Sequence, residues 1–177
     1  MNPITIWDLS ALDALQRCRT PGLDAFFSTV THLGDGGIFW ICLAVLLLCI
    51  PKTRRLGLCV ALALVFDGLL CNVLIKPLAA RVRPYELRNV VLLIRQPTDA
   101  SFPSGHAAAA FAVSTALACK RSRLAIPAAV LAAVIAFSRL YLYVHYPTDV
   151  FAGIILGALC GWLGFLVSRR ILRKKET

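Results

Sequence analysis

The chain has 177 residues, of which 59% are hydrophobic, and its mean hydropathy is +0.76. Because an ordinary soluble domain is only about 45–50% apolar, this composition argues against a water-soluble protein and predicts an integral membrane protein with one domain. The formal net charge of +10 by itself fits nucleic acid, anionic lipid or a topology signal. The seven cysteines show neither paired CxxC motifs nor the spacing of a zinc site, so we interpret them as small core residues.

The N-terminal part predicts two short amphipathic helices. Residues 4–18 carry apolar side chains at helical spacing, and residues 23–33 repeat the pattern until the glycine-rich segment 34–37 interrupts it. We expect residues 1–35 to form interfacial helices and residues 36–173 to form a transmembrane catalytic core. A basic region followed by an apolar stretch and a small-residue cleavage site is not visible, so no cleavable signal peptide is predicted.

Five apolar segments follow, and we interpret them as the transmembrane helices of an all-α polytopic bundle. They are residues 38–50, 56–75, 105–119, 124–143 and 148–168. The first segment would rise only about 20 Å against a hydrocarbon core of about 30 Å. It therefore crosses with little tilt or recruits residues before Gly36.

The positions of the basic residues indicate the orientation in the membrane. Clusters at 52–55, 120–123 and 169–175 fall on one face of a five-span bundle, which the positive-inside rule makes the cytoplasmic face. We interpret the charge as this signal and expect no nucleic acid partner. The C-terminus is then cytoplasmic, and the long polar connection 77–103 meets His106 and residues 145–149 on the extracytoplasmic side.

Small residues predict tight seams between the helices. Gly153, Gly157 and Gly161 recur every four residues in the last span, and the span after His106 is rich in alanine. We favour packing inside one bundle over a dimer face, and the oligomeric state stays open.

Three polar clusters carry the chemistry, and all three are expected at the same membrane face. They are Lys76-x6-Arg83-Pro84, Pro103-Ser104-Gly105-His106 and Ser138-Arg139-x5-His145-x3-Asp149. In these positions, and in this order, the chain resembles the type 2 phosphatidic-acid phosphatase superfamily of lipid phosphate phosphatases. The resemblance implies a catalytic core related to that of vanadium-dependent haloperoxidases.

The first set of these residues fits a phosphoryl group. Lys76, Arg83 and Arg139 would neutralise the charge that spreads over the oxygens during transfer. Ser104 and the Gly105 N–H lie where a helix is expected to begin, and helix N-termini bind anions. Lys76 and Arg83 could instead simply extend toward water at a helix end.

The second set fits covalent catalysis. We expect His145 to be the nucleophile, with Asp149 holding its other ring nitrogen and stabilising the imidazolium. His106 fits the general acid that protonates the leaving oxygen and later activates water, although alone it would read as a helix-terminal histidine. Because three fixed cations already neutralise the phosphate, we predict no metal and no cofactor, as the resemblance also implies.

The remaining polar residues are not among those that define the three clusters. We expect a structural role for His32 and an orienting role for Asn72. Asp67 lies nine residues before Lys76, about 180° around an α-helix, so we expect it not to contact the site. Five residues in or beside the connection are left outside the predicted site: Arg81, Tyr85, Glu86, Arg88 and Arg95.

The sequence predicts an enzyme that dephosphorylates a membrane lipid. The short chain and the extracytoplasmic site resemble bacterial undecaprenyl pyrophosphate phosphatases of the cytoplasmic membrane, and phosphatidylglycerophosphate and phosphatidic acid are the rival substrates. The alternative of another class is a phospholipid-binding or transport protein that uses the same basic pocket without turnover. The histidines and Asp149 argue against it, because a binder needs neither a nucleophile nor a proton donor.

Overall fold

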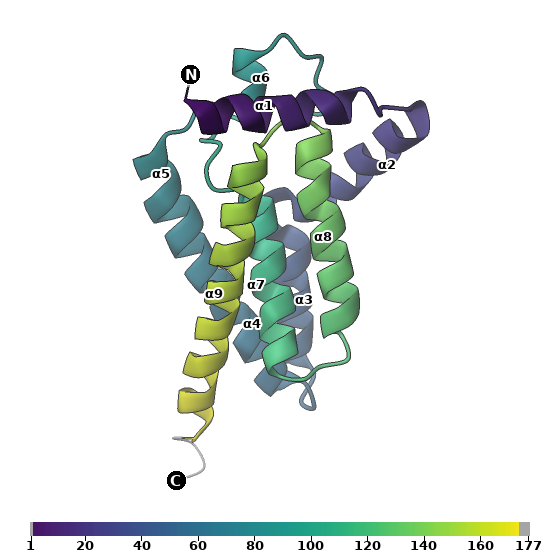
Figure 1. Ribbon diagram of the computed structural model, residues 1–177. Coiled ribbons are helices and arrows are strands. Elements are labelled where there is room, and N and C mark those ends of the chain that lie inside the picture. The colour runs from purple at the N-terminus through teal and green to yellow at the C-terminus, as the bar shows by residue number, and fades with distance from the viewer. Residues whose placement is uncertain (1, 174–177) are drawn as a thin grey trace.

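The structure is a computed structural model that describes residues 2–173, and in this part of the chain every regular element is helical. The predicted all-α class is therefore confirmed. Lys174 and Lys175, which belong to the predicted C-terminal basic cluster, lie outside the described residues. Helices α3, α4, α7, α8 and α9 run alongside one another as a bundle, while α1 lies across one end of it (Figure 1). The elements are α1 (Pro3–Gln16), α2 (Pro21–Thr31), the 3-10 segment η1 (His32–Gly37), α3 (Ile38–Cys49), α4 (Arg54–Asp67), the π-helical segment η2 (Gly68–Ile75), α5 (Lys76–Ala79), α6 (Pro84–Leu87), α7 (Gly105–Cys119), α8 (Ala125–Tyr141) and α9 (Pro147–Arg173).

The two N-terminal helices begin at caps that the sequence supplies. Asn2 accepts a hydrogen bond from the Thr5 N–H at 2.8 Å, Thr20 accepts one from the Leu23 N–H at 3.3 Å, and a proline follows each cap. Proline fits this position because its missing N–H would have no partner inside the helix. Both helices are thus confirmed close to the predicted limits, and their place at the membrane interface stays a prediction.

Three helical stretches are long and apolar enough to cross a membrane: Pro21–Cys49, Arg54–Leu87 and Pro147–Arg173. The first shows that the segment from residue 38 does recruit residues before Gly36, through a kink in η1. α7 and α8 are apolar helices of 15 and 17 residues. The helix expected to end at Lys76 continues to Ala79, so that prediction was wrong by three residues.

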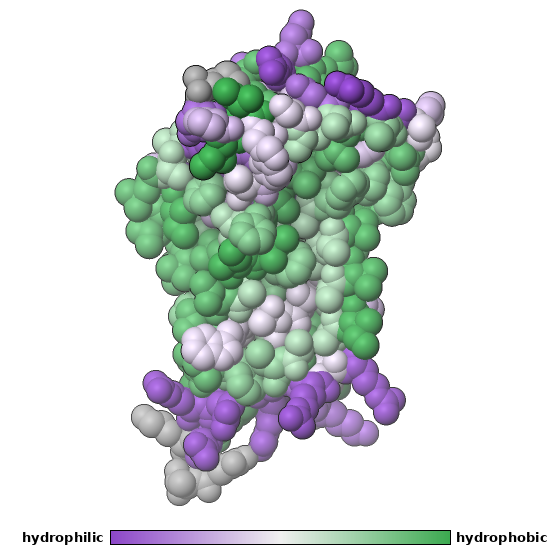
Figure 2. All heavy atoms as spheres, viewed as in Figure 1, coloured by the Kyte–Doolittle hydropathy of each residue, from purple (hydrophilic) through white to green (hydrophobic). Residues whose placement is uncertain are grey.

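The surface of the bundle has an apolar band between two polar ends (Figure 2). The α3–α4 turn, the α7–α8 turn and the C-terminal end of α9 lie together at the end opposite α1 (Figure 1). Among residues 2–173, the basic residues predicted to face the cytoplasm therefore share one end of the molecule. This arrangement fits the predicted topology, and the sidedness itself stays a prediction.

The centre of the bundle is the seam between α7 and α9, which also packs against α4. A Cβ atom added to Gly157 would lie 2.2 Å from the Ala108 carbonyl oxygen, and one added to Gly161 would lie 2.5 Å from the Ala112 carbonyl oxygen. The two backbones are therefore in direct contact, and the predicted close packing lies inside the bundle. This seam fixes the start of α7, which carries His106, against the start of α9, which carries Asp149.

Candidate active site

A cavity of about 470 Å³ lies at the end of the bundle that is nearest α1. Five of the residues singled out in the sequence line this one cavity, although they come from three segments of the chain. They are Lys76, Arg83, His106, Arg139 and His145. The fold thus places three cations and two imidazoles around a space that can hold a phosphate group.

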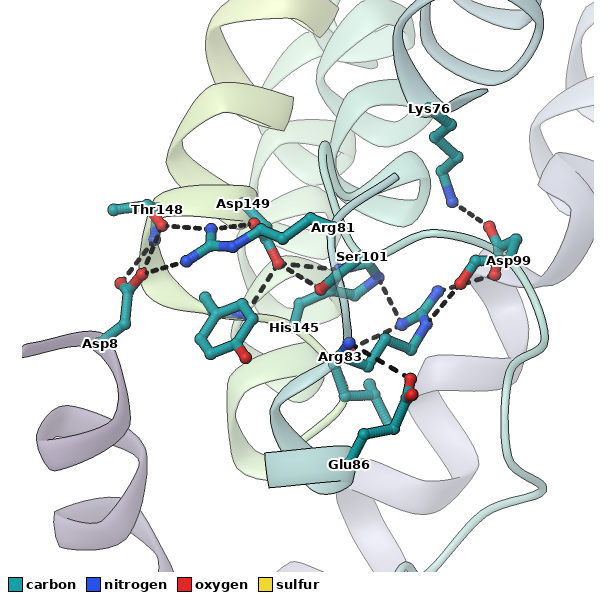
Figure 3. A network of polar contacts seen from close by, with 12 residues as sticks. Asp8, Lys76, Arg81, Arg83, Glu86, Asp99, Ser101, His145, Thr148 and Asp149 are labelled. Carbon is teal, nitrogen blue, oxygen red and sulfur yellow. Dashed lines mark hydrogen bonds and ion pairs between the residues drawn. The ribbon is translucent and has the colours of Figure 1, made fainter. Parts of the chain in front are cut away.

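Two of the cations are paired with one carboxylate that the sequence analysis missed (Figure 3). Asp99 accepts hydrogen bonds from Lys76 Nζ through Oδ2 and from Arg83 Nη2 through Oδ1, the latter at 2.7 Å. Burial would raise the pKa of Asp99, but the hydrogen bonds and charges of Lys76 and Arg83 outweigh it and hold the pKa at about 2. Asp99 therefore occupies, as an anion, the place between two cations that the phosphate is predicted to take.

The third cation, Arg139, projects from the last turn of α8 and is 3% exposed. Its Nη1 donates to Thr31 Oγ1 at 2.6 Å, while its buried Nε has no hydrogen-bond partner among residues 2–173. A buried guanidinium with an unused donor is costly unless an anion binds to it. Arg139 is therefore suited to bind one more anionic oxygen.

His145 lies in the turn between α8 and α9 with its two ring nitrogens in different surroundings. Nε2 lies 3.3 Å from Arg83 Nη1, and Nδ1 lies 3.6 Å from Asp149 Oδ2. Burial, followed by the charges of Arg83, Arg139 and Lys76, lowers the pKa of His145 well below its ordinary value. The imidazole is therefore neutral at physiological pH, which is the form that can act as a nucleophile.

Asp149 lies beside His145, but the predicted hydrogen bond between them is not formed. The 3.6 Å separation exceeds hydrogen-bond length, and Nδ1 has no hydrogen-bond partner among the described residues. The carboxylate is instead held by three other donors: Ser101 Oγ at 2.5 Å, the Tyr146 N–H at 3.0 Å and Arg81 Nη1 at 2.5 Å. The two residues are thus adjacent, and a small shift of the ring would complete the pair.

Arg81, which the sequence analysis left outside the site, links Asp149 to the N-terminal helix (Figure 3). Its Nη2 donates to Asp8 Oδ2 at 2.8 Å, and its guanidinium lies 3.9 Å from the centre of the Tyr146 ring. Asp8 is fully buried and also accepts from the N–H and Oγ1 of Thr148, at 3.1 and 2.6 Å. Helix α1 is therefore part of the structure that holds the start of α9.

His106 has a carboxylate partner that also comes from the N-terminal part of the chain. Its Nε2 lies 3.0 Å from Asp35 Oδ1, and Asp35 Oδ2 lies 2.7 Å from Nδ1 of His32. His32 and Asp35 both line the cavity. The structural role predicted for His32 stays a prediction, but its position is at the site.

A second cavity of about 420 Å³ shares His106 and Lys76 with the first. Asp67 and Asn72 line it together with Lys76, so the expectation that Asp67 points away from Lys76 was wrong, although Asp67 does not line the first cavity. The reason is that residues 68–75 form a π-helix, which turns less per residue than an α-helix and brings positions 67 and 76 toward the same side. Asn72 lies in the same cavity as Lys76, and its orienting role stays a prediction.

Ser104 and Gly105 stand at the start of α7 as predicted. The Ser104 N–H donates to the Asp149 carbonyl at 3.1 Å, and the buried Ser104 Oγ has no partner among residues 2–173. A Cβ on Gly105 would lie 3.3 Å from Asn72 Oδ1, so glycine allows the start of α7 to lie close to η2. Their phosphate contacts stay predictions, and neither residue lines the first cavity.

Metal binding finds no support in the part of the chain that the structure describes, where no three His, Cys, Asp or Glu side chains gather to hold an ion. Metal independence nevertheless stays a prediction. Asp35 and Asp99 could have been noticed from the sequence as isolated acids, one within a glycine-rich break and one shortly before the Ser-Gly-His motif. No spacing rule connects either residue to its partner.

Comparison with known proteins places this arrangement in a family. The sequence model of the PAP2 superfamily matches residues 56–173, which include all three motifs. The lipid A 4'-phosphatase of Bacteroides thetaiotaomicron is 30% identical over 90% of this chain and 76% of its own length. The decaprenylphosphoryl-5-phosphoribose phosphatase of Mycobacterium tuberculosis is 37% identical over 80% of this chain and 78% of its own length. The undecaprenyl-diphosphatase of Sulfolobus acidocaldarius is 35% identical over 72% of this chain and 61% of its own length.

Solved structures show the same fold. A transmembrane PAP2-type phosphatidylglycerolphosphate phosphatase from Bacillus subtilis superposes with a TM-score of 0.76 at 29% identity, covering 98% of this chain and 88% of that one. LpxE of Aquifex aeolicus also gives a TM-score of 0.76, at 30% identity over 88% of this chain and 93% of that one. The transmembrane helical fold is thereby confirmed, and these relatives argue against the alternative of a protein without turnover.

Proposed function

The chain belongs to the PAP2 superfamily and is a lipid phosphatase, and we propose that it works without a metal ion through a covalent phosphohistidine on His145. The observation that carries this proposal is the single cavity lined by His145, His106 and the three cations. The neutral state of His145 supports its role as the attacking group, because the lone pair on Nε2 must be free to reach phosphorus.

The reaction takes place in two displacements. In the first, His145 Nε2 bonds to the terminal phosphorus while the bond from this phosphorus to the leaving oxygen breaks, and His106 gives this oxygen a proton. The leaving group is the lipid monophosphate when a pyrophosphate is cleaved and the lipid alcohol when a monophosphate is cleaved. In the second, water attacks phosphorus, His106 takes the water proton, and the bond to Nε2 breaks to release inorganic phosphate. Asp149 stabilises the positive charge that His145 carries in between.

The cations bind the oxygens that carry charge during both steps. Arg83 and Lys76 have to exchange Asp99 for the phosphate, while Arg139 offers a donor that is already unpaired. Arginine suits this role because its planar group donates two parallel hydrogen bonds to one phosphate. Three fixed charges supply the stabilisation that magnesium gives in many other phosphoryl-transfer enzymes.

The proposed substrate is undecaprenyl pyrophosphate, cleaved at the extracytoplasmic face of the membrane, with phosphatidylglycerophosphate and phosphatidic acid as alternatives. The cavity lies at the end of the bundle opposite the α3–α4 and α7–α8 turns, whose basic residues are typical of a cytoplasmic face. The names of the relatives include an undecaprenyl-diphosphatase and phosphatases of phosphatidylglycerophosphate and lipid A, which supports a lipid with its phosphate at the membrane surface.

The proposal is tested by phosphate release from a panel of prenyl pyrophosphates, phosphatidylglycerophosphate, phosphatidic acid and lysophospholipids. Wild type is expected to prefer the prenyl pyrophosphate and to keep full activity in excess EDTA, and His145→Ala is expected to abolish turnover of every substrate while the protein still folds. Normal turnover by His145→Ala would show that another group is the nucleophile. Loss of wild-type activity in EDTA, restored by a divalent cation, would rule out the metal-independent scheme.

The proposed sidedness has a separate test. A cysteine introduced between residues 88 and 98 should react with a membrane-impermeant maleimide added from outside intact cells, in a background where the native cysteines are replaced. Labelling only from the cytoplasmic side would show that the cavity faces the cytoplasm and would refute the proposed sidedness.

A further inference from the structure

The segment Thr31–Gly37 contacts the catalytic constellation although it lies outside residues 56–173, which match the superfamily. Thr31 Oγ1 accepts a hydrogen bond from Arg139, and Asp35 Oδ1 lies 3.0 Å from His106 Nε2. Two of the motif residues therefore have side-chain partners in a part of the chain that carries no motif.

The backbone of this segment is shaped to approach His106 closely. A Cβ added to Gly34 would lie 2.4 Å from Cδ2 of the His106 ring, so only glycine leaves the ring its place. Gly36 and Gly37 have φ values of 57° and 68°, in the left-handed region that glycine adopts without strain. The chain turns here between α2 and α3, and this turn presents the Asp35 carboxylate to the imidazole.

We propose that Asp35 is a positioning residue for His106, so that the site contains a second histidine–carboxylate pair beside His145 and Asp149. This inference rests on the proposed function, in which His106 is the general acid and base. It assigns to the first third of the chain a part in the proton transfer.

The Asp35 carboxylate determines which ring nitrogen of His106 exchanges a proton with the leaving oxygen and with water. Because Asp35 accepts the Nε2–H, the second proton of the imidazolium is on Nδ1, which donates it to the leaving lipid oxygen. In the second step the neutral Nδ1 takes a proton from water, and Asp35 stabilises the imidazolium that forms again. Asp35 keeps its negative charge throughout, and its other oxygen is held by His32 Nδ1 at 2.7 Å.

This role predicts that the loss caused by Asp35→Asn depends on the leaving group. An alkoxide leaves poorly without a proton, whereas nitrophenolate leaves without one. Asp35→Asn should slow phosphate release from a lipid monophosphate by about 10- to 100-fold, part of the 10²- to 10⁴-fold that a general acid typically contributes. In the first turnover, the rate of nitrophenolate release from p-nitrophenyl phosphate should stay within about threefold of wild type. The steady-state rate should then be slower than that of wild type, because hydrolysis of the phosphoenzyme needs His106 to activate water.

Two further variants separate positioning from folding. Gly34→Ala leaves every charge in place but pushes the His106 ring, so it should show the same dependence on the leaving group. Asp24→Asn is the matched control, because the Asp24 carboxylate bonds to Arg19 and Tyr141 and does not line the cavity. Its loss should affect both substrates equally. The double variant Asp35→Asn with His106→Ala should be no slower than His106→Ala alone.

The inference is overturned if Asp35→Asn slows the first turnover of both substrates by the same factor, or if it turns over both at wild-type rates. His145→Ala distinguishes this failure from failure of the proposed function. If His145→Ala still releases nitrophenolate, the phosphohistidine scheme itself is wrong. If His145→Ala is inactive while Asp35→Asn shows no dependence on the leaving group, only the role of Asp35 is refuted.

Discussion

Replacing Gly157 with alanine tests whether the contact between α7 and α9 supports the site. The added Cβ would lie 2.2 Å from the carbonyl oxygen of Ala108. Ordinary contact needs about 3.5 Å, so the crossing has to open by about 1 Å. The carbonyl belongs to the backbone of α7 and cannot rotate away as a side chain could.

The expected loss of stability follows from two opposing contributions. Overpacking of a close contact costs about 1–3 kcal/mol, and here the rigid backbone places it at the upper end. Alanine in a helix interior is favoured over glycine by about 1 kcal/mol. The net loss of about 2 kcal/mol corresponds to a fall of about 4–8 °C in the unfolding midpoint of a chain of this size.

The same opening should reduce activity, because α7 begins at the Ser-Gly-His motif and α9 begins near Asp149. The Ser104 N–H donates to the Asp149 carbonyl at 3.1 Å, so the two helix starts are joined directly. A displacement of about 1 Å in a catalytic group can cost about 10²-fold in rate. Gly157→Ala should therefore lower kcat by one to two orders of magnitude on this principle.

The assay is thermal unfolding in detergent together with kcat on a lipid monophosphate. Gly22→Ala is the control, since Gly22 is helical and a Cβ there meets no atom within 4 Å. It should leave the midpoint unchanged or slightly raised, and kcat unchanged. A Gly157→Ala protein with the midpoint and kcat of wild type would refute the claim that the two backbones touch.

Three further predictions concern the ion pairs of Asp8 and Asp99. Asp8→Asn should lower the unfolding free energy by about 2 kcal/mol. This is less than the roughly 3–5 kcal/mol of a fully broken buried ion pair, because Arg81 still forms its ion pair with Asp149. An unchanged midpoint of chemical denaturation would contradict this prediction. Asp99→Asn should bind inorganic phosphate about three- to tenfold more tightly, since about 1 kcal/mol of competing ion pairing is removed, and unchanged inhibition by phosphate would show that Asp99 does not compete. Because the pKa of Asp99 is lowered to about 2, its stabilisation is present above the ordinary carboxylate pKa near 4 and is lost as the pH falls toward 2. Asp99→Asn should therefore flatten the pH dependence of the unfolding midpoint in this range.

The sequence determined the elements and the motif residues because both depend on local spacing. Apolar segments of fixed length predict helices, and the cap at Thr20 and the glycines of α9 act within a few residues of their own positions. His145 lies in the turn before α9 and Asp149 lies in the first turn of α9, so their proximity follows from their short separation along the chain. The gathering of the three motifs at one face followed from counting the spans and assigning their direction.

Asp67 shows where local reasoning failed. Its predicted direction assumed an α-helix from residue 56 to Lys76, whereas residues 68–75 form a π-helix. The apolar pattern of this stretch does not distinguish the two helices, because seven of its eight residues are apolar and show no periodicity. Only the packing of the stretch in the bundle determines how far it turns.

The partners of the charged groups were decided by the tertiary structure. Asp99 lies 23 positions from Lys76, Asp35 lies 71 from His106, and Asp8 lies 73 from Arg81. No periodicity relates residues so far apart, since their separation in space depends on how α1, η1 and the connection 80–104 fold over the end of the bundle. The sequence by itself therefore determined which cations and imidazoles of the motifs line the cavity, and their roles in phosphoryl transfer stay predictions. The tertiary structure decided which carboxylates hold these residues, because an ion pair depends on distances of a few ångströms that only the packed chain defines.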